Sequence, residues 1–170
     1  MNNRFFIMGI ILVVLGASTP LMTLQLPQPI TTIQVRIVTG NRPAAGTDDP
    51  VFLGLGGREF RIQDQNLAFN DFASGSEHTY TFGAASSVSP ATLNDPRDPQ
   101  LTTDDLFAFP VYIRKNEDTA SQSVSSWNVE EVTVTVNPGR NQIVYSALEG
   151  PANIWLTNDA GLILYLKRRR

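Results

Sequence analysis

The sequence contains no cysteine, one histidine and little clustered positive charge, and each shortage narrows what the protein can do. Without cysteine there is no disulfide, no thiolate nucleophile and no cysteine-ligated zinc site. Lys and Arg number 13 against 16 Asp and Glu, giving a formal net charge of -3. A nucleic-acid partner is therefore not expected, because neutralising phosphates requires clustered cations. The basic cluster Lys167–Arg170 lies at the end of the sequence.

The sequence also lacks the patterns that mark common enzymes. His78 is the single histidine, and no G-x-S-x-G motif supplies the nucleophile that a Ser-His-Asp device needs. The glycines at 54, 56 and 57 have no following lysine or helix, so they indicate a turn rather than a phosphate-binding loop. Adjacent acidic residues on a strand point to opposite faces, so they do not converge on one substrate. We expect a non-enzymatic protein. The adjacent acidic pairs are Asp48-Asp49, Asp104-Asp105, Glu117-Asp118 and Glu130-Glu131.

An apolar run near the N-terminus differs from the rest of the chain. Arg4 precedes the uncharged stretch Phe5–Ala17, and small residues follow before Pro20. This order is typical of a secretory signal, and the longer apolar stretch to residue 26 is also long enough for a membrane anchor. Residues 1–26 are therefore predicted to form a hydrophobic helix that is either a signal peptide or an anchor. The protein is then exported, and is either secreted or anchored on the outer side of a membrane.

The remaining chain has a globular composition, with 42% hydrophobic and 17% charged residues, and reads as short strands. Alternating apolar residues over 33–37 and 132–136 predict half-buried strands, and residues 51–62 predict a hairpin around Gly56-Gly57. No convincing long helical period follows residue 26. The pattern favours an all-β sandwich, with a closed barrel as the second choice. The other predicted strands lie at residues 79–82, 109–113, 143–145, 154–156 and 162–166.

Two irregular features stand out in this pattern. Trp127 and Val129 have the opposite parity to Val132, so we expect either a bulge near Glu130-Glu131 or a tryptophan that packs outside the strand pair. The stretch Ser86–Leu106 is long and rich in Pro and Asp. Such a connection is either functional or an ordered excursion over the sheet.

Two polar loops could hold a hard cation. Gly46-Thr47-Asp48-Asp49 follows the first predicted strand, and Asn70-Asp71 follows the third. Calcium binds six to eight oxygens from carboxylates, amides and backbone carbonyls, which two acidic loops at one end of a sandwich can supply. Ordinary turn formation is the alternative explanation of the same residues.

Several segments together resemble the PLAT/LH2 domain family. They are IQVRIVTG at 33–40, AGTD at 45–48, VFL at 51–53, NDFASG at 70–75, TYTF at 79–82, WNVEEV at 127–132 and IWL at 154–156. The resemblance implies an eight-stranded antiparallel β-sandwich of two four-stranded sheets over 33–166, after a linker at 27–32 and before a basic tail at 167–170. It also implies a non-catalytic module that binds a membrane lipid surface or a protein partner, often with calcium. The implied calcium ligands are Gly46, Thr47, Asp48, Asn70 and Asp71.

Three functions remain open at this point. The first is a calcium-assisted module at an envelope surface, with Leu67 and Phe69 either inserting into a membrane or, as we favour, packing in the core. The second is an ion-independent structural or protein-interaction domain of the envelope. The third is a small exported hydrolase, which would need Asp104, Asp105 and Glu77 to converge in one cleft. Oligomeric state is not indicated.

Overall fold

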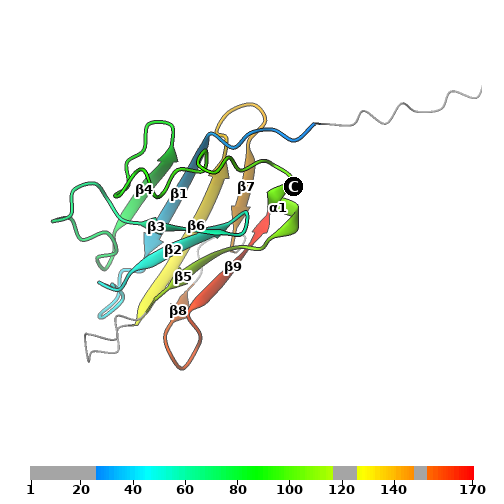
Figure 1. Cartoon of the computed structure of the whole chain (residues 1–170). Helices are drawn as coiled ribbons and strands as arrows, with labels where there is room; N and C mark the ends of the chain where they lie inside the picture. The colour runs from blue at the N-terminus through cyan, green and yellow to red at the C-terminus, as the bar shows by residue number, and fades with distance from the viewer. Residues whose placement is uncertain (1–25, 117–125, 148–152) are drawn as a thin grey trace, which may run out of the picture.

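The computed structural model describes residues 26–116, 126–147 and 153–170, and this part of the chain is all-β with one short helix (Figure 1). The predicted N-terminal hydrophobic helix lies outside the described residues. The elements are β1 Thr32–Thr39, β2 Val51–Leu55, β3 Arg58–Ile62, β4 Glu77–Gly83, α1 Asp105–Ala108, β5 Val111–Lys115, β6 Trp127–Val136, β7 Ile143–Ser146, β8 Ile154–Leu156 and β9 Ile163–Arg168.

The strands are all antiparallel and follow the order β3-β2-β5-β9-β7-β6-β1-β4, with β8 added beside the start of β6. They form two facing layers, β3-β2-β5-β9 and β4-β1-β6-β7 (Figure 1). The prediction of eight strands in two separate four-stranded sheets is therefore only partly right. β9 pairs with β5 as far as Leu166 and then with β7 through Lys167 and Arg168, so one hydrogen-bonded path joins both layers.

The core lies between the layers because each strand places alternate side chains inward. On β1, Ile33, Val35 and Ile37 are buried while the residues between them are partly exposed. Val35 faces Tyr80 of β4 and Val134 of β6 in register, so the same alternation continues across three strands. The alternation read from the sequence is the pattern that builds this core.

The predicted bulge is confirmed in β6. Opposite β1, Val38 pairs with Glu131 and Thr39 pairs with Val129, so Glu130 is the extra residue. The extra residue restores the parity, and Trp127 and Val132 both reach the core. The Trp127 indole N–H donates to Thr39 Oγ1 at 3.2 Å, which satisfies its one polar atom inside the core.

The long connection after β4 is an ordered cover for an edge strand. Asn94 is buried, and its side-chain oxygen accepts a hydrogen bond from the Arg61 backbone N–H on β3 at 2.8 Å. Arg58 donates to the carbonyls of Asp95 and Pro99. An uncovered edge would leave such backbone groups open to pairing with another chain. The connection therefore has a structural role along β3.

The sandwich has two ends with different loops. The loops at 40–50 and 63–76 lie where β1 finishes and β4 begins, because the Thr39 N–H donates to the Ser76 carbonyl. The residues before β1, the helix α1 and the β6–β7 turn lie at the opposite end (Figure 1). The predicted linker is part of this second end, with Ile30 fully buried, and β9 continues two residues past the predicted domain boundary to Arg168.

Candidate functional site

The two loops predicted to hold a cation meet at the first end. The Thr47 N–H donates to the Phe72 carbonyl at 3.2 Å, which joins the 46–49 loop to the 70–75 loop. Gly46 allows this approach, because a Cβ at that position would lie 2.8 Å from the Phe72 carbonyl oxygen. The glycine of the G-T-D motif is thus required by close backbone packing.

A cavity of about 190 Å³ opens between these loops. Four of the five predicted ligands line it, namely Thr47, Asp48, Asn70 and Asp71. Gly46 is not part of the lining but sits against residues 72–74 behind it. The structure therefore brings the predicted residues together in one place, although their role as calcium ligands stays a prediction.

The two adjacent aspartates of the first loop have different environments. Asp48 is exposed at the cavity, whereas Asp49 is buried and its carboxylate pairs with the Lys115 ammonium of β5 at 2.5 Å. The Asp49 N–H also donates to Thr47 Oγ1 at 3.1 Å. The sequence analysis missed the Asp49–Lys115 ion pair, because its partners are 66 residues apart and no local pattern connects them.

Asp71 is held in place from two sides. Its carboxylate oxygen Oδ1 accepts the Asp64 backbone N–H at 3.0 Å, and its backbone carbonyl accepts the Tyr80 hydroxyl at 3.0 Å. Burial raises the pKa of the Asp71 carboxyl above its ordinary value. A bound cation would reverse this effect, because an opposite charge favours the ionised form.

The donor set suits calcium in type but is incomplete. Three aspartates line the cavity, Asp48, Asp49 and Asp71, of which Asp49 is paired with Lys115. The amides of Gln63 and Asn70 line it as well, so the side chains offer oxygen donors of the kind calcium prefers. Within the described ranges, no three His, Cys, Asp or Glu side chains are grouped so that they could hold a metal ion. Arg61 also lines the cavity and competes electrostatically with a cation. Backbone carbonyls and lipid or water oxygens would have to complete the coordination.

Two large apolar side chains are exposed beside the cavity. Leu67 is 67% exposed and Phe69 is 40% exposed, so our expectation that both pack in the core is wrong. Both residues also line the cavity. Phe69 makes an edge-to-face contact with the His78 ring at 4.6 Å, and this contact orients its side chain. Exposed apolar groups here sit directly beside carboxylates.

The residues considered for catalysis do not converge. Glu77 begins β4 at the cavity end and accepts a hydrogen bond from Arg36. Asp104 and Asp105 lie at the start of α1 at the other end, where Asp105 accepts hydrogen bonds from Thr102. The cluster needed by the hydrolase hypothesis is therefore not formed. The pair Glu117-Asp118 lies outside the described residues.

Among the residues with described positions, no helix is long and apolar enough to cross a bilayer.

Comparison with known families identifies the class of domain to which the chain belongs. The PLAT/LH2 domain family matches residues 33–164, which is most of the chain. The chain therefore belongs to the PLAT/LH2 domain family. No curated protein matches it.

Solved structures show the same fold inside larger proteins. The alpha toxin of Clostridium absonum aligns with a TM-score of 0.54 at 22% identity, covering 88% of this chain and 34% of the toxin. The alpha-toxin of Clostridium perfringens gives 0.54 at 23% identity, covering 82% and 32%. A coral 8R-lipoxygenase, whose description reports calcium activation through a C2-like domain, gives 0.49 at 18% identity, covering 81% and 17%. This chain thus spans about a third or less of each of these proteins.

Proposed function

We propose that this domain is a non-catalytic module that docks on a membrane surface through the cavity end, with calcium assistance. The observation that carries the proposal is the exposure of Leu67 and Phe69 beside the oxygen-lined cavity. A phospholipid bilayer has an apolar interior and anionic headgroups at its surface. Exposed apolar side chains can enter the interior, and carboxylates can bind a calcium ion that bridges to the headgroups. Membership of the PLAT/LH2 family supports a binding role.

Charge explains why this end would need a cation. Asp48 and Asp71 face the cavity, and the whole chain carries a formal charge of -3, so an anionic surface is repelled. Asp48, Asn70 and Asp71 would hold the ion, with Thr47 and the Gly46 carbonyl as further oxygen donors. Calcium would supply the positive charge that links the carboxylates to lipid phosphates. Leu67 and Phe69 would then lie against the acyl region.

The proposal includes export. The basic start, apolar centre and small-residue exit of residues 1–26 support a signal peptide or anchor, placing the domain on the outer side of a membrane or in the medium. Millimolar calcium affinities, typical of extracellular modules, would suffice there.

The test is co-sedimentation of the full chain with phosphatidylcholine vesicles containing phosphatidylserine, in calcium and in EDTA. The calcium-dependent part of binding is the quantity to measure, because any contribution of residues 1–26 is common to both conditions. Asp48→Asn should abolish that part, and Leu67→Ser should weaken it about tenfold through lost apolar burial. The matched controls are Asp159→Asn and Leu93→Ser, which alter an exposed acid and an exposed leucine outside this cavity. Equal binding in calcium and EDTA would rule out the calcium form of the proposal.

Arg61 gives a variant with the opposite expected sign. Because Arg61 lines the cavity that would hold the proposed ion, Arg61→Gln should strengthen calcium binding in calorimetry. A variant that merely unfolds this region would lose calcium affinity, so a gain in affinity cannot be explained by misfolding. Unchanged affinity in Arg61→Gln together with unchanged affinity in Asp48→Asn would place any bound calcium elsewhere.

An ion-independent protein-interaction domain of the envelope is the second candidate. Two observations favour it: the described residues hold no group of three acidic or histidine ligands, and Arg61 occupies the same cavity. A protein partner captured equally well in calcium and chelator, with no calorimetric heat from calcium, would select this function. Turnover of lipid or glycan that disappears in Asp104→Ala would instead overturn the non-catalytic assignment.

A further inference from the structure

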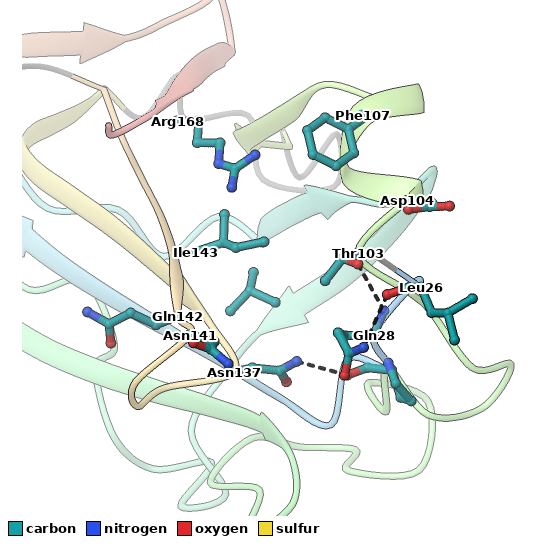
Figure 2. Close-up of a pocket in the computed structure, with 12 residues that line it drawn as sticks. Leu26, Gln28, Thr103, Asp104, Phe107, Asn137, Asn141, Gln142, Ile143 and Arg168 are labelled. Carbon is teal, nitrogen blue, oxygen red and sulfur yellow. Dashed lines mark hydrogen bonds between the residues drawn. The ribbon is translucent and has the colours of Figure 1, made fainter. Parts of the chain in front are cut away.

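The opposite end of the sandwich holds a second, larger cavity of about 660 Å³ (Figure 2). Its walls come from five separate segments: the residues before β1, the start of α1, the end of β6, the β6–β7 turn and the end of β9. None of its lining residues lines the cavity at the first end. This cavity is therefore a separate site that the proposed calcium function does not use.

The walls of this cavity combine apolar and polar groups. Leu26 is 75% exposed and Phe107 is 71% exposed, and both line the cavity (Figure 2). Ile143 is half-buried, while Asn141 and Gln142 of the β6–β7 turn provide amide groups on the other side. Such a lining suits a ligand with both an apolar part and a polar headgroup.

Arg168 is the cation that lines this cavity. It belongs to β9, pairs with Tyr145 of β7, and its guanidinium carbon lies 5.3 Å from the centre of the Phe107 ring. Figure 2 shows the guanidinium extended toward the cavity, whereas the Asp104 carboxylate points away from its centre. The planar fork of N–H groups on a guanidinium suits a phosphate.

Further positive charge lies next to Arg168 along the chain. Lys167 is its neighbour in β9, and Arg169 and Arg170 follow, all of them exposed. The Arg169 backbone N–H donates to the Val144 carbonyl at 2.8 Å, so the basic run continues the sheet rather than leaving it. The predicted basic tail is thus a positively charged rim on this end of the sandwich.

The residues before β1 are fastened beside this rim. The Asn137 side-chain oxygen accepts the Thr31 and Thr32 N–H groups, and its amide donates to the Pro29 carbonyl at 2.8 Å. Gln28 and Thr103 form two further hydrogen bonds. The apolar segment of residues 1–26 is therefore joined to the domain at its basic end.

From these observations we infer that the basic end is a calcium-independent docking surface for anionic phospholipid in a bilayer. The lipid phosphate lies at Arg168 within the larger cavity, and Leu26 and Phe107 contact the acyl boundary. Lys167, Arg169 and Arg170 add attraction to the anionic surface, each Lys or Arg near such a surface strengthening binding about fivefold. This site carries its own positive charge, so it needs no metal ion, in contrast to the cavity at the other end.

Absence of cysteine gives a direct test on the full chain. A single cysteine at position 107, introduced as Phe107→Cys, carries a fluorophore, and a second protein carries it at Leu67→Cys. Vesicles of phosphatidylcholine with a headgroup spin label, with or without phosphatidylserine, quench a fluorophore that docks on the membrane. All samples contain residues 1–26, so this segment contributes equally throughout.

The label at position 107 should be quenched in EDTA when phosphatidylserine is present, and much less in its absence. Arg168→Gln should lower the ratio of docked to undocked label about fivefold. The control Arg42→Gln removes the same charge from an exposed residue in the loop after β1 at the other end and should have little effect. Because the Phe107→Cys label itself removes one apolar contact, a label at Leu26→Cys repeats the measurement with Phe107 intact.

Three results with vesicles would overturn the inference. The first is quenching at both basic-end labels that is equally strong with and without phosphatidylserine. The second is an equal loss of quenching in Arg168→Gln and Arg42→Gln. The third is quenching at these labels that occurs only in calcium. Inorganic phosphate that binds the cavity while the labels remain unquenched would identify a soluble phosphate ligand instead, and would also overturn it. The label at Leu67→Cys tests the calcium proposal separately. If its quenching does not depend on calcium, the calcium proposal fails and the inference about the basic end is unaffected.

Discussion

The two ends of this sandwich share a design but differ in charge. Each end places two exposed apolar side chains beside a cavity, Leu67 and Phe69 at one end and Leu26 and Phe107 at the other. Three aspartates and Arg61 line the first cavity, whereas Arg168 and Asp104 line the second and further basic residues adjoin Arg168 in the chain. The difference teaches that the fold fixes where loops meet, while the charge of a few loop residues decides whether an anionic surface is approached directly or through a cation.

Strand β1 separates the two ends. It is eight residues long, so at about 3.3 Å per residue the ends lie roughly 26 Å apart. With the strands standing upright on a bilayer, only one end can touch that bilayer. The two proposed surfaces would therefore act alternately on one membrane or together on two.

The largest expected effect comes from removing the ion pair under the acidic end. Lys115→Met leaves the Asp49 carboxylate buried without its charged partner, which should cost about 3–5 kcal/mol. For a domain of this size the melting temperature should fall by roughly 6–20 °C, measured by calorimetry in EDTA.

The matched double variant separates charge from packing. Lys115→Met with Asp49→Leu removes both charges and should recover most of the lost stability, since apolar replacement of a buried ion pair is often neutral or stabilising. If the double variant melts as low as Lys115→Met alone, the loss comes from packing rather than from an unpaired carboxylate.

The corresponding change at the basic end is Asn137→Gly. Asn137 has a φ of 47°, which glycine adopts freely, so this substitution removes only the side chain that fastens residues 29–32. Loss of these hydrogen bonds should cost about 1–2 kcal/mol and lower the melting temperature by roughly 2–8 °C.

Hydrogen exchange shows where that loss occurs. In Asn137→Gly the Thr31 and Thr32 amides should exchange faster, while the Thr47 amide at the acidic end keeps its protection. Asn141→Gly, in the same turn with an exposed side chain, is the control and should change neither amide. Faster exchange at both ends would mean that the two ends are not independent.

Much of the scaffold was predictable from the sequence, because two-residue alternation reports directly on a sheet with one buried face. The strands at 33–37 and 132–136 followed from that alternation alone, and a bulge near Glu130-Glu131 was one of its two interpretations. The gathering of Thr47, Asp48, Asn70 and Asp71 followed from the PLAT/LH2 resemblance.

The remaining features depend on long-range contacts that no local pattern encodes. Alternation does not show that β9 changes partner at Lys167, so the closure of the two layers was missed. Asp48 and Asp49 look equivalent in sequence, and only the position of Lys115 decides which of them is buried. The basic-end cavity was missed because it combines five segments from residues 26 to 168.

The sheet surface between the ends provides a reference for pH dependence. Glu59 accepts two hydrogen bonds of 2.7 Å from Arg114, which lower the pKa of its carboxyl below the ordinary 4.5. The stability it contributes is present above the unfolded-state pKa and is lost as the pH falls through the folded pKa. Glu59→Gln should lower the melting temperature by about 1–3 °C at neutral pH and by nothing in strong acid. An equal loss at both pH values would show that Glu59 acts through packing and not through its charge.

Asp71 at the acidic end should behave with the opposite sign, and the effect should be the smallest. Burial raises the pKa of its carboxyl above the ordinary 3.8, so in the absence of a cation the ionised form disfavours the folded state above that pKa. Asp71→Asn keeps an oxygen that can accept the Asp64 N–H and removes the charge. In EDTA at neutral pH it should raise the melting temperature by about 1–2 °C, and this gain should vanish as the pH falls through the folded pKa.

In calcium the sign of the effect of Asp71→Asn should reverse, because wild type gains stability from the bound ion and Asp71→Asn does not. Asp159→Asn, an exposed acid in the β8–β9 turn, should show neither the gain nor the reversal. A gain in EDTA that persists unchanged in calcium would mean that Asp71 is a desolvated carboxylate without a role in cation binding.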